Sequence, residues 1–162
     1  MPMLDAIDLE IVRLLQENAR LPQVEIARSI GLAPSAVLER LRKLEARGVI
    51  TGYVALIDPR SLDQRLLAFI AVRTTDRPGE GRVARELAAV SEVLEVHHVA
   101  GEDCLMLKVR ARDPEHLAQI LRDRLGHIAG IQSTRTTIVL ESIKESARLA
   151  IPAPPASDEV AS

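Results

Sequence analysis

Residues 22–47 read PQVEIARSIGLAPSAVLERLRKLEAR, and this stretch decides the fold of the N-terminal part of the chain. Pro22 is a good first helical residue and Gly31 suits the position just after a helix, so the pattern predicts a short helix between them. Pro34 begins a further helix that runs to about Arg47. Two short helices joined by a three-residue turn have the spacing of a helix-turn-helix.

The helix that begins at Pro34 has an apolar side and a polar side. At 100° per residue, Leu41 and Leu44 fall within about 40° of Val37 and form a stripe for a core. The opposite side carries small and basic residues, which suit close approach to the major groove and contacts to bases or phosphates. The expected DNA-binding residues are Pro34, Ser35, Ala36, Glu39, Arg40, Arg42, Lys43 and Arg47. The alternative is an ordinary solvated helix with i,i+4 ion pairs.

The charge of the N-terminal segment is segregated. Asp5 is the expected N-cap of a first, acidic helix that ends near Asn18, whereas the basic residues gather on the helix from Pro34. The net charge of −2 excludes a histone-like protein that binds DNA by bulk charge, but it allows a reader with a local basic face. With one Phe, one Tyr and no Trp, recognition of single strands by base stacking is not expected.

The second half of the chain alternates between strand and helix patterns. Strands are predicted at residues 66–74, 93–99, 104–111 and 131–140, and helices at 81–90 and from Asp113-Pro114 to Gly126. The order β, α, β, β, α, β is that of the ferredoxin-like arrangement, so the fold class is α+β. Residues 100–103 form the tight turn between the middle strands.

The expected division of the chain follows these patterns. Residues 1–57 form a helix-turn-helix domain, in which residues 49–57 are a strand-rich segment with Gly52 as a bend, and residues 58–65 form a hinge. Residues 66–148 form the ferredoxin-like domain, and the Ala/Pro/Ser-rich residues 149–162 form a disordered tail. No apolar run approaches the length of a membrane span, and no signal peptide is evident, so a cytoplasmic protein is expected.

Several motifs together resemble the Lrp/AsnC (feast/famine) family of transcription regulators. They are the segments 4–8, 19–21, 31–35, 38–45 and 48–53, followed by 99–103, 107–109 and 134–136. The resemblance covers about residues 4–150. It implies a winged-helix DNA-binding domain, a hinge, and an amino-acid-sensing domain of ferredoxin-like fold that pairs into dimers through its sheet. It also implies that dimers assemble into octamers, with the effector amino acid bound where dimers meet.

The resemblance also indicates where the effector binds. A free amino acid needs an acceptor for its ammonium and donors for its carboxylate. The expected effector-binding residues are Gly101, Glu102, Asp103, Cys104, Thr134, Arg135 and Thr136. The alternative is a plain polar hairpin turn beside an ordinary strand. Where the family's turn often reads Gly-Asp-x-Asp, Cys104 replaces the second acid, which leaves the identity of the effector open.

Metal and redox sites are not expected, nor is a cofactor. Cys104 is the only cysteine and fits a small, half-buried apolar position better than a redox sensor. His97 and His98 are adjacent on a strand and so face opposite sides of it. Regulation of transcription is the predicted function, with double-stranded DNA as partner. The alternatives are an enzyme resembling siroheme decarboxylases, which share this two-domain layout, and an interaction module that does not read DNA.

Overall fold

The computed structural model describes residues 4–77, 80–101 and 104–152 of the 162-residue chain. The described residues divide into two compact units, one formed by residues 4–56 together with 146–152, and the other by the described residues between 57 and 145. Within the described ranges, no helix is long and apolar enough to cross a membrane. Of the tail expected from residue 149, the described part reaches Pro152 and adopts no regular element, and residues 153–162 lie outside the described ranges.

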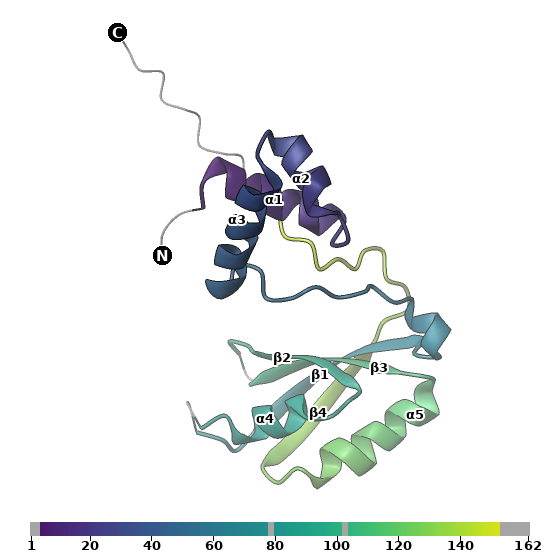
Figure 1. The fold of residues 1–162 in the computed structure, drawn as a ribbon. Helices are drawn as coiled ribbons and strands as arrows, with labels where there is room; N and C mark the ends of the chain where they lie inside the picture. The colour runs from purple at the N-terminus through teal and green to yellow at the C-terminus, as the bar shows by residue number, and fades with distance from the viewer. Residues whose placement is uncertain (1–3, 78–79, 102–103, 153–162) are drawn as a thin grey trace. The chain divides into compact units, whose positions relative to one another are not determined.

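The first unit contains three helices, α1 (Ala6–Glu17), α2 (Gln23–Ile30) and α3 (Pro34–Ala46) (Figure 1). Asp5 caps α1, since its side chain accepts a hydrogen bond of 2.7 Å from the backbone N–H of Asp8. The other two helices begin after Pro22 and Ala33, which supply no side-chain cap. Their stability therefore rests on packing around a shared core. That core contains Ile11, Ile26, Ala27, Val37, Leu41 and Leu44.

The prediction of strand structure at residues 49–57 is wrong. The backbone N–H groups of Val49 and Ile50 bond back to the carbonyl of Leu44 and so complete the end of α3. Residues 51–58 then adopt no regular secondary structure, and no described strand pairs with them. The apolar, β-branched composition favours a strand, but a strand needs a partner for its backbone groups.

The second unit is a four-stranded antiparallel sheet with helices. Its order is β1 (Leu66–Thr74), α4 (Arg82–Ala88), β2 (Val93–His98), β3 (Leu105–Ala111), α5 (Pro114–Gln119) and β4 (Ile131–Ile138). The sheet order β2-β3-β1-β4 is the ferredoxin-like one, as predicted. A 3-10 turn, Pro59–Leu62, precedes β1. The helix expected as far as Gly126 is divided, because α5 continues as a π-helix (Ile120–Arg124) and a 3-10 turn (Leu125–His127).

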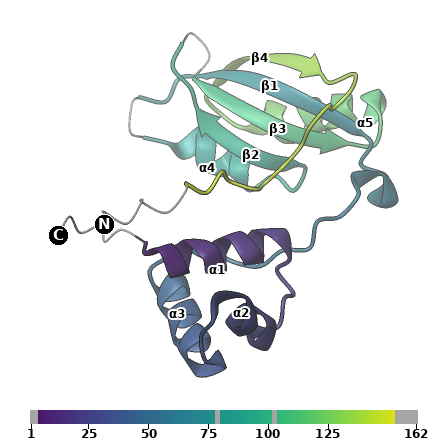
Figure 2. The same cartoon turned by 90° about the horizontal axis from the view of Figure 1, so that it is seen from above.

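One face of the sheet is covered by α4 and α5, as Figures 1 and 2 show. The core lies between them, where alternate residues such as Ile70 and Leu107 point toward the helices and are buried. Phe69, on the opposite face, is 39% exposed. The segment after β4 crosses back over β3 on this opposite face (Figure 2), where the carboxylate of Glu145 lies 3.0 Å from Lys108 Nζ and 2.5 Å from Arg110 Nη2.

Candidate nucleic-acid interface and effector site

Helix α3 presents the two sides that its sequence predicts. Val37, Leu41 and Leu44 are buried in the core of the first unit. On the outer side, Pro34, Ser35, Glu39, Arg42, Lys43 and Arg47 are exposed, while Ala36 and Arg40 are half-buried. Pro34 starts the helix, where its missing N–H is not needed, so the small residues of the first turn lie at its leading end. The helix therefore has small side chains in its first turn and basic side chains in its C-terminal half.

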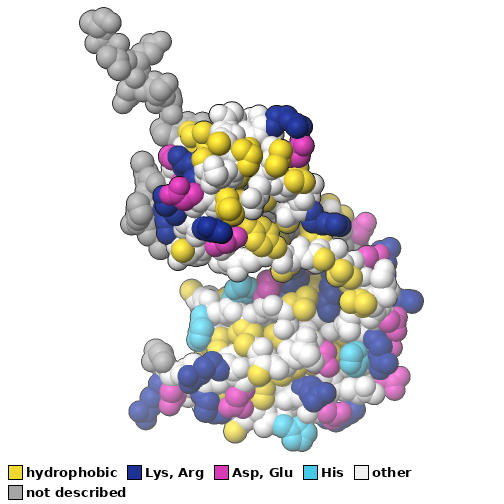
Figure 3. Space-filling model, viewed as in Figure 1, with side chains coloured by type: hydrophobic (Ala, Val, Ile, Leu, Met, Phe, Trp, Pro, Cys, Tyr) yellow, Lys and Arg dark blue, Asp and Glu magenta, His cyan; other side chains and the backbone are white. Residues whose placement is uncertain are grey.

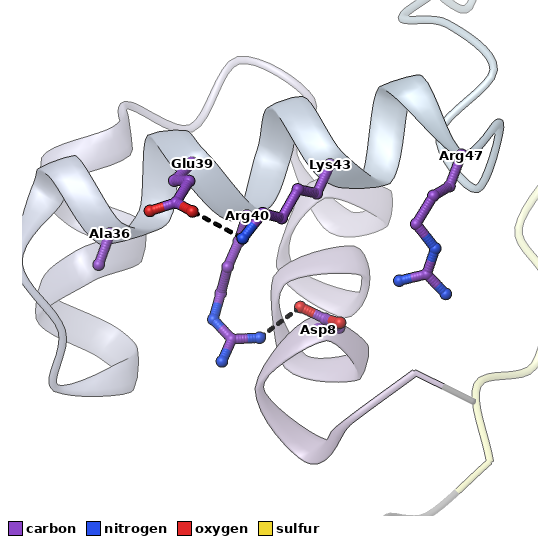
Figure 4. Close-up of a pocket in the computed structure, with 6 residues that line it drawn as sticks. All are labelled: Asp8, Ala36, Glu39, Arg40, Lys43 and Arg47. Atoms are coloured by element: carbon purple, nitrogen blue, oxygen red, sulfur yellow. Dashed lines mark hydrogen bonds and ion pairs between the residues drawn. The ribbon is translucent and has the colours of Figure 1, made fainter. Parts of the chain in front are cut away.

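A hollow of about 270 Å³ lies beside this outer side (Figure 4). Its lining comes from α3, together with one acid of α1: Asp8, Ala36, Glu39, Arg40, Lys43 and Arg47. In Figure 4 the side chains of Arg40 and Arg47 extend from α3 on the side where Asp8 lies. Five of the eight residues expected to bind DNA thus line one concave surface.

The charged residues of this surface are paired in different ways. Lys43 Nζ lies 2.6 Å from Glu39 Oε1, in an i,i+4 pair in which both side chains are about two-thirds exposed. The hydrogen bond from Lys43 holds the pKa of Glu39 below its ordinary value. Exposed pairs of this kind contribute little to stability. A phosphate can therefore replace Glu39 as the partner of Lys43 at small energetic cost.

Arg40 has a different environment. Its Nη1 donates to Asp5 Oδ2 and to Asp8 Oδ1, at 2.7 Å each. The two carboxylates raise the pKa of the guanidinium, with the hydrogen bond to Asp5 as the largest contribution. This link was not predicted from the sequence, because Arg40 and Asp8 are 32 residues apart. The available signal was an acid at a position of α1 that faces inward, because Asp8 is buried beside Ile11.

Basic side chains are otherwise interspersed with acidic ones. On the face of the molecule drawn in Figure 3, Lys and Arg (blue) lie among Asp and Glu (magenta), and the described residues show no broad basic area in this view. The net charge of −2 agrees with this distribution. On this face, a nucleic-acid partner would therefore be recognised by local geometry rather than by a long-range positive potential.

The turn between β2 and β3 is closed by a hydrogen bond of 3.1 Å from the Val99 N–H to the Cys104 carbonyl. Gly101 has a φ of +137°, a conformation that side-chain-bearing residues rarely adopt, and open space where a Cβ would be. Cys104 is a free, half-buried thiol. Glu102 and Asp103, two of the expected effector-binding residues, lie outside the described residues.

The structure does not gather all the expected effector residues into one pocket. Successive strand residues point to opposite faces, so Arg135 lies on the face opposite to Thr134 and Thr136. Thr134 pairs with Val72, and Val72 pairs with Leu105 at the foot of the turn. Two strand spacings, or roughly 10 Å, therefore separate β4 from β3 at this end of the sheet. Within one chain, the turn and β4 are two separate surfaces.

No metal site is evident within the described ranges, where no three His, Cys, Asp or Glu side chains come together. His97 instead contacts Glu95, with 3.1 Å between Nε2 and Oε2, and Lys108 reaches the same carboxylate at 3.2 Å. These pairs lie on the sheet face that α4 and α5 leave open.

Comparison with known proteins gives matches over both units. A family model for the Lrp/AsnC ligand binding domain matches residues 67–149, and one for winged helix-turn-helix DNA-binding domains matches residues 4–51. The HTH-type transcriptional regulator FL11 of Pyrococcus horikoshii is 40% identical over 149 residues, which are 91% of this chain and 97% of FL11. The leucine-responsive regulatory protein of Salmonella typhimurium is 38% identical over 151 residues, or 91% and 92% of the two chains.

Solved structures give the same result. The transcriptional regulator NMB0573 of Neisseria meningitidis, in complex with L-Met, has a TM-score of 0.84 and 32% identity, over 91% of this chain and 97% of that one. The feast or famine regulatory protein Rv3291c of M. tuberculosis, complexed with L-methionine, has a TM-score of 0.85 and 37% identity, over 93% and 100%. None of these four proteins is named as an enzyme, so the decarboxylase alternative has no support.

Proposed function

Since this chain belongs to the Lrp/AsnC family of transcription regulators, we propose that it binds specific DNA sites through α3 and changes that binding when a free amino acid occupies its second unit. The observation that carries the proposal is the pairing of a slim, basic outer side on α3 with a sheet domain that matches the family's ligand-binding model. Acting on chromosomal DNA, such a regulator works in the cytoplasm and has no need of a catalytic group.

The proposed DNA-contacting residues fall into two groups. Pro34, Ser35 and Ala36 allow the first turn of α3 to approach base edges closely, as small residues do in the major groove. Arg42, Lys43 and Arg47 supply charge for guanine or for phosphates. Glu39 has the chemistry to accept a hydrogen bond from cytosine N4. Arg40 belongs to the same surface, but its guanidinium is held by the carboxylates of Asp5 and Asp8, unlike the exposed side chains of Arg42 and Lys43.

L-Methionine is the first effector to test, because two relatives of similar length have been solved with it. We propose that the turn at residues 101–104 holds one charged end of the amino acid. Thr134, Arg135 and Thr136 of β4 are the remaining proposed contacts. The separation of the turn from β4 within one chain favours a site completed by a second copy, so the proposed active form is a homodimer or an octamer built from dimers.

The test begins with selection of preferred duplexes from a random DNA library. Binding to the selected duplex is then titrated at fixed salt, with and without each of the twenty amino acids, because phosphate contacts make affinity strongly salt-dependent. A sequence-preferring shift that one or a few amino acids change would support both parts of the proposal. DNA binding that no amino acid changes would support the DNA-binding part of the proposal and refute the proposed effector site. Selection of no preferred duplex would refute DNA reading, and light scattering on the same samples gives the oligomeric state.

A further inference from the structure

Arg40 joins the middle of α3 to the beginning of α1. A single nitrogen, Nη1, lies 2.7 Å from an oxygen of Asp5 and 2.7 Å from an oxygen of Asp8. Asp5 is the N-cap of α1, and Asp8 lies in its first turn. Figure 4 shows the guanidinium of Arg40 pointing from α3 toward Asp8. The link therefore connects the DNA-reading helix to the helix behind it at a single position.

Burial makes this link different from the other ion pairs of the first unit. The side chain of Asp8 is 12% exposed and that of Arg40 30%, whereas Glu39 and Lys43 are both above 60%. Asp8 is the one charged residue that is buried within the described residues. A buried carboxylate without a partner is strongly unfavourable, so loss of Arg40 favours a rearrangement of α1 against α3.

The charge around Arg40 also argues against a role in attracting DNA. One guanidinium stands against two carboxylates, so the group of three residues carries a net charge of −1. A group with that charge does not draw a phosphate toward α3. By contrast, Lys43 has a single exposed partner and Arg42 is exposed on the outer side of the helix.

We propose that Arg40 is a positioning residue: held by Asp5 and Asp8, it sets how α3 is presented to the major groove, and it does not itself neutralise a phosphate. This inference rests on the DNA-binding function proposed above. A helix that is misplaced relative to its own domain loses base contacts, so the cost falls on specific binding. Phosphate contacts tolerate such a shift, because exposed side chains such as Arg42 and Lys43 have long, flexible stems that can still reach the backbone of the duplex.

The competing role for Arg40, a direct phosphate contact, predicts the opposite sign for a change at Asp8. If Arg40 bound a phosphate, the Asp8→Asn substitution would remove a competing carboxylate, and DNA would bind more tightly. If Arg40 positions α3, the same substitution weakens one of its two anchors, because Asn keeps an acceptor oxygen but loses the charge, and specific binding becomes weaker. The two roles also differ in salt dependence. The slope of log K against log salt is negative, and each lost phosphate contact reduces its magnitude by about 0.9.

The experiment compares Arg40→Gln, Asp8→Asn, the double variant and Arg42→Gln on the selected duplex, from about 50 to 200 mM salt. Arg40→Gln and Asp8→Asn should each weaken specific binding roughly tenfold, about the value of one base contact. The double variant should be no weaker than the weaker single variant. The salt slope should stay unchanged for Arg40→Gln. Arg42→Gln is the control for a phosphate contact and should reduce the magnitude of the slope by about 0.9 for each protomer bound.

Tighter binding by Asp8→Asn, or a shallower salt slope for Arg40→Gln that equals the slope of Arg42→Gln, would overturn the proposal. Chemical unfolding of the wild type, the two single variants and the double variant provides a readout that needs no DNA. Arg40 and Asp8 should show non-additive effects on the free energy of unfolding, and additive effects would remove the link itself. If the wild-type chain selects no duplex, the function proposed above fails, while the unfolding cycle still decides whether Arg40 anchors α3.

Discussion

The Gly101→Ala substitution separates effector binding from DNA binding. Gly101 has a φ of +137° in the turn between β2 and β3, and a Cβ added there would have no atom within 4 Å. The cost of the substitution is therefore a backbone cost, on the order of 1–3 kcal/mol for a non-glycine residue in a sparsely populated conformation. If the effector binds only the native turn, this cost weakens effector binding by about 5- to 150-fold.

The assay is calorimetric titration with L-methionine, or with whichever amino acid the duplex-binding screen identifies. Binding to the selected duplex without effector should remain unchanged, because α3 belongs to the other unit. Gly81→Ala is the matched control, since Gly81 also has a positive φ, +57°, and also has open space around it, but it precedes α4. An effector titration of Gly101→Ala that matches those of the wild type and of Gly81→Ala would refute the placement of the effector at this turn.

Three further predictions concern stability and specificity. The Gly130→Ala variant should unfold about 1–3 kcal/mol more easily in urea, because φ is +96° and the new Cβ would lie 3.1 Å from Cγ2 of the buried Val83. The second unit should lose stability as the pH falls below about 4.5, because the hydrogen bond from Lys108 lowers the pKa of Glu145 and the unfolded chain therefore takes up the proton first. In acid titrations followed by circular dichroism, Glu145→Gln should reduce the dependence of the unfolding free energy on pH. Glu39→Gln should strengthen binding to random duplex at low salt but relax the base preference at one position, as measured by repeating the library selection; an unchanged selected sequence would remove Glu39 from the set of base contacts.

Local pattern was enough to predict most of the secondary structure. The buried stripe of α3 follows from a 3.6-residue period, and β1 was predicted at the bounds the structure gives it, because a short run of apolar and β-branched residues favours a strand. The segment at residues 49–57 shows the limit of this reasoning. Its composition favours a strand as strongly as that of β1 does, but a strand forms only where another strand pairs with it, and a local stretch of sequence does not reveal whether one is present.

The proposed sites were predictable only in part. The two-residue period already implies that Arg135 faces away from Thr134 and Thr136, so that separation could have been deduced from sequence. The distance between β4 and the turn could not, because it depends on the strand order β2-β3-β1-β4.

The sequence by itself determined most of the elements of this protein, the residue-49–57 segment excepted, together with the buried stripe of α3 and the residues that this helix presents on its outer side. Only the tertiary structure decided which charges meet. Arg40 and Asp8 are 32 residues apart, and Arg110 and Glu145 are 35 apart. Periodicity acts over a few residues, whereas such ion pairs depend on how one packed element lies against another, and that is set by the whole core at once.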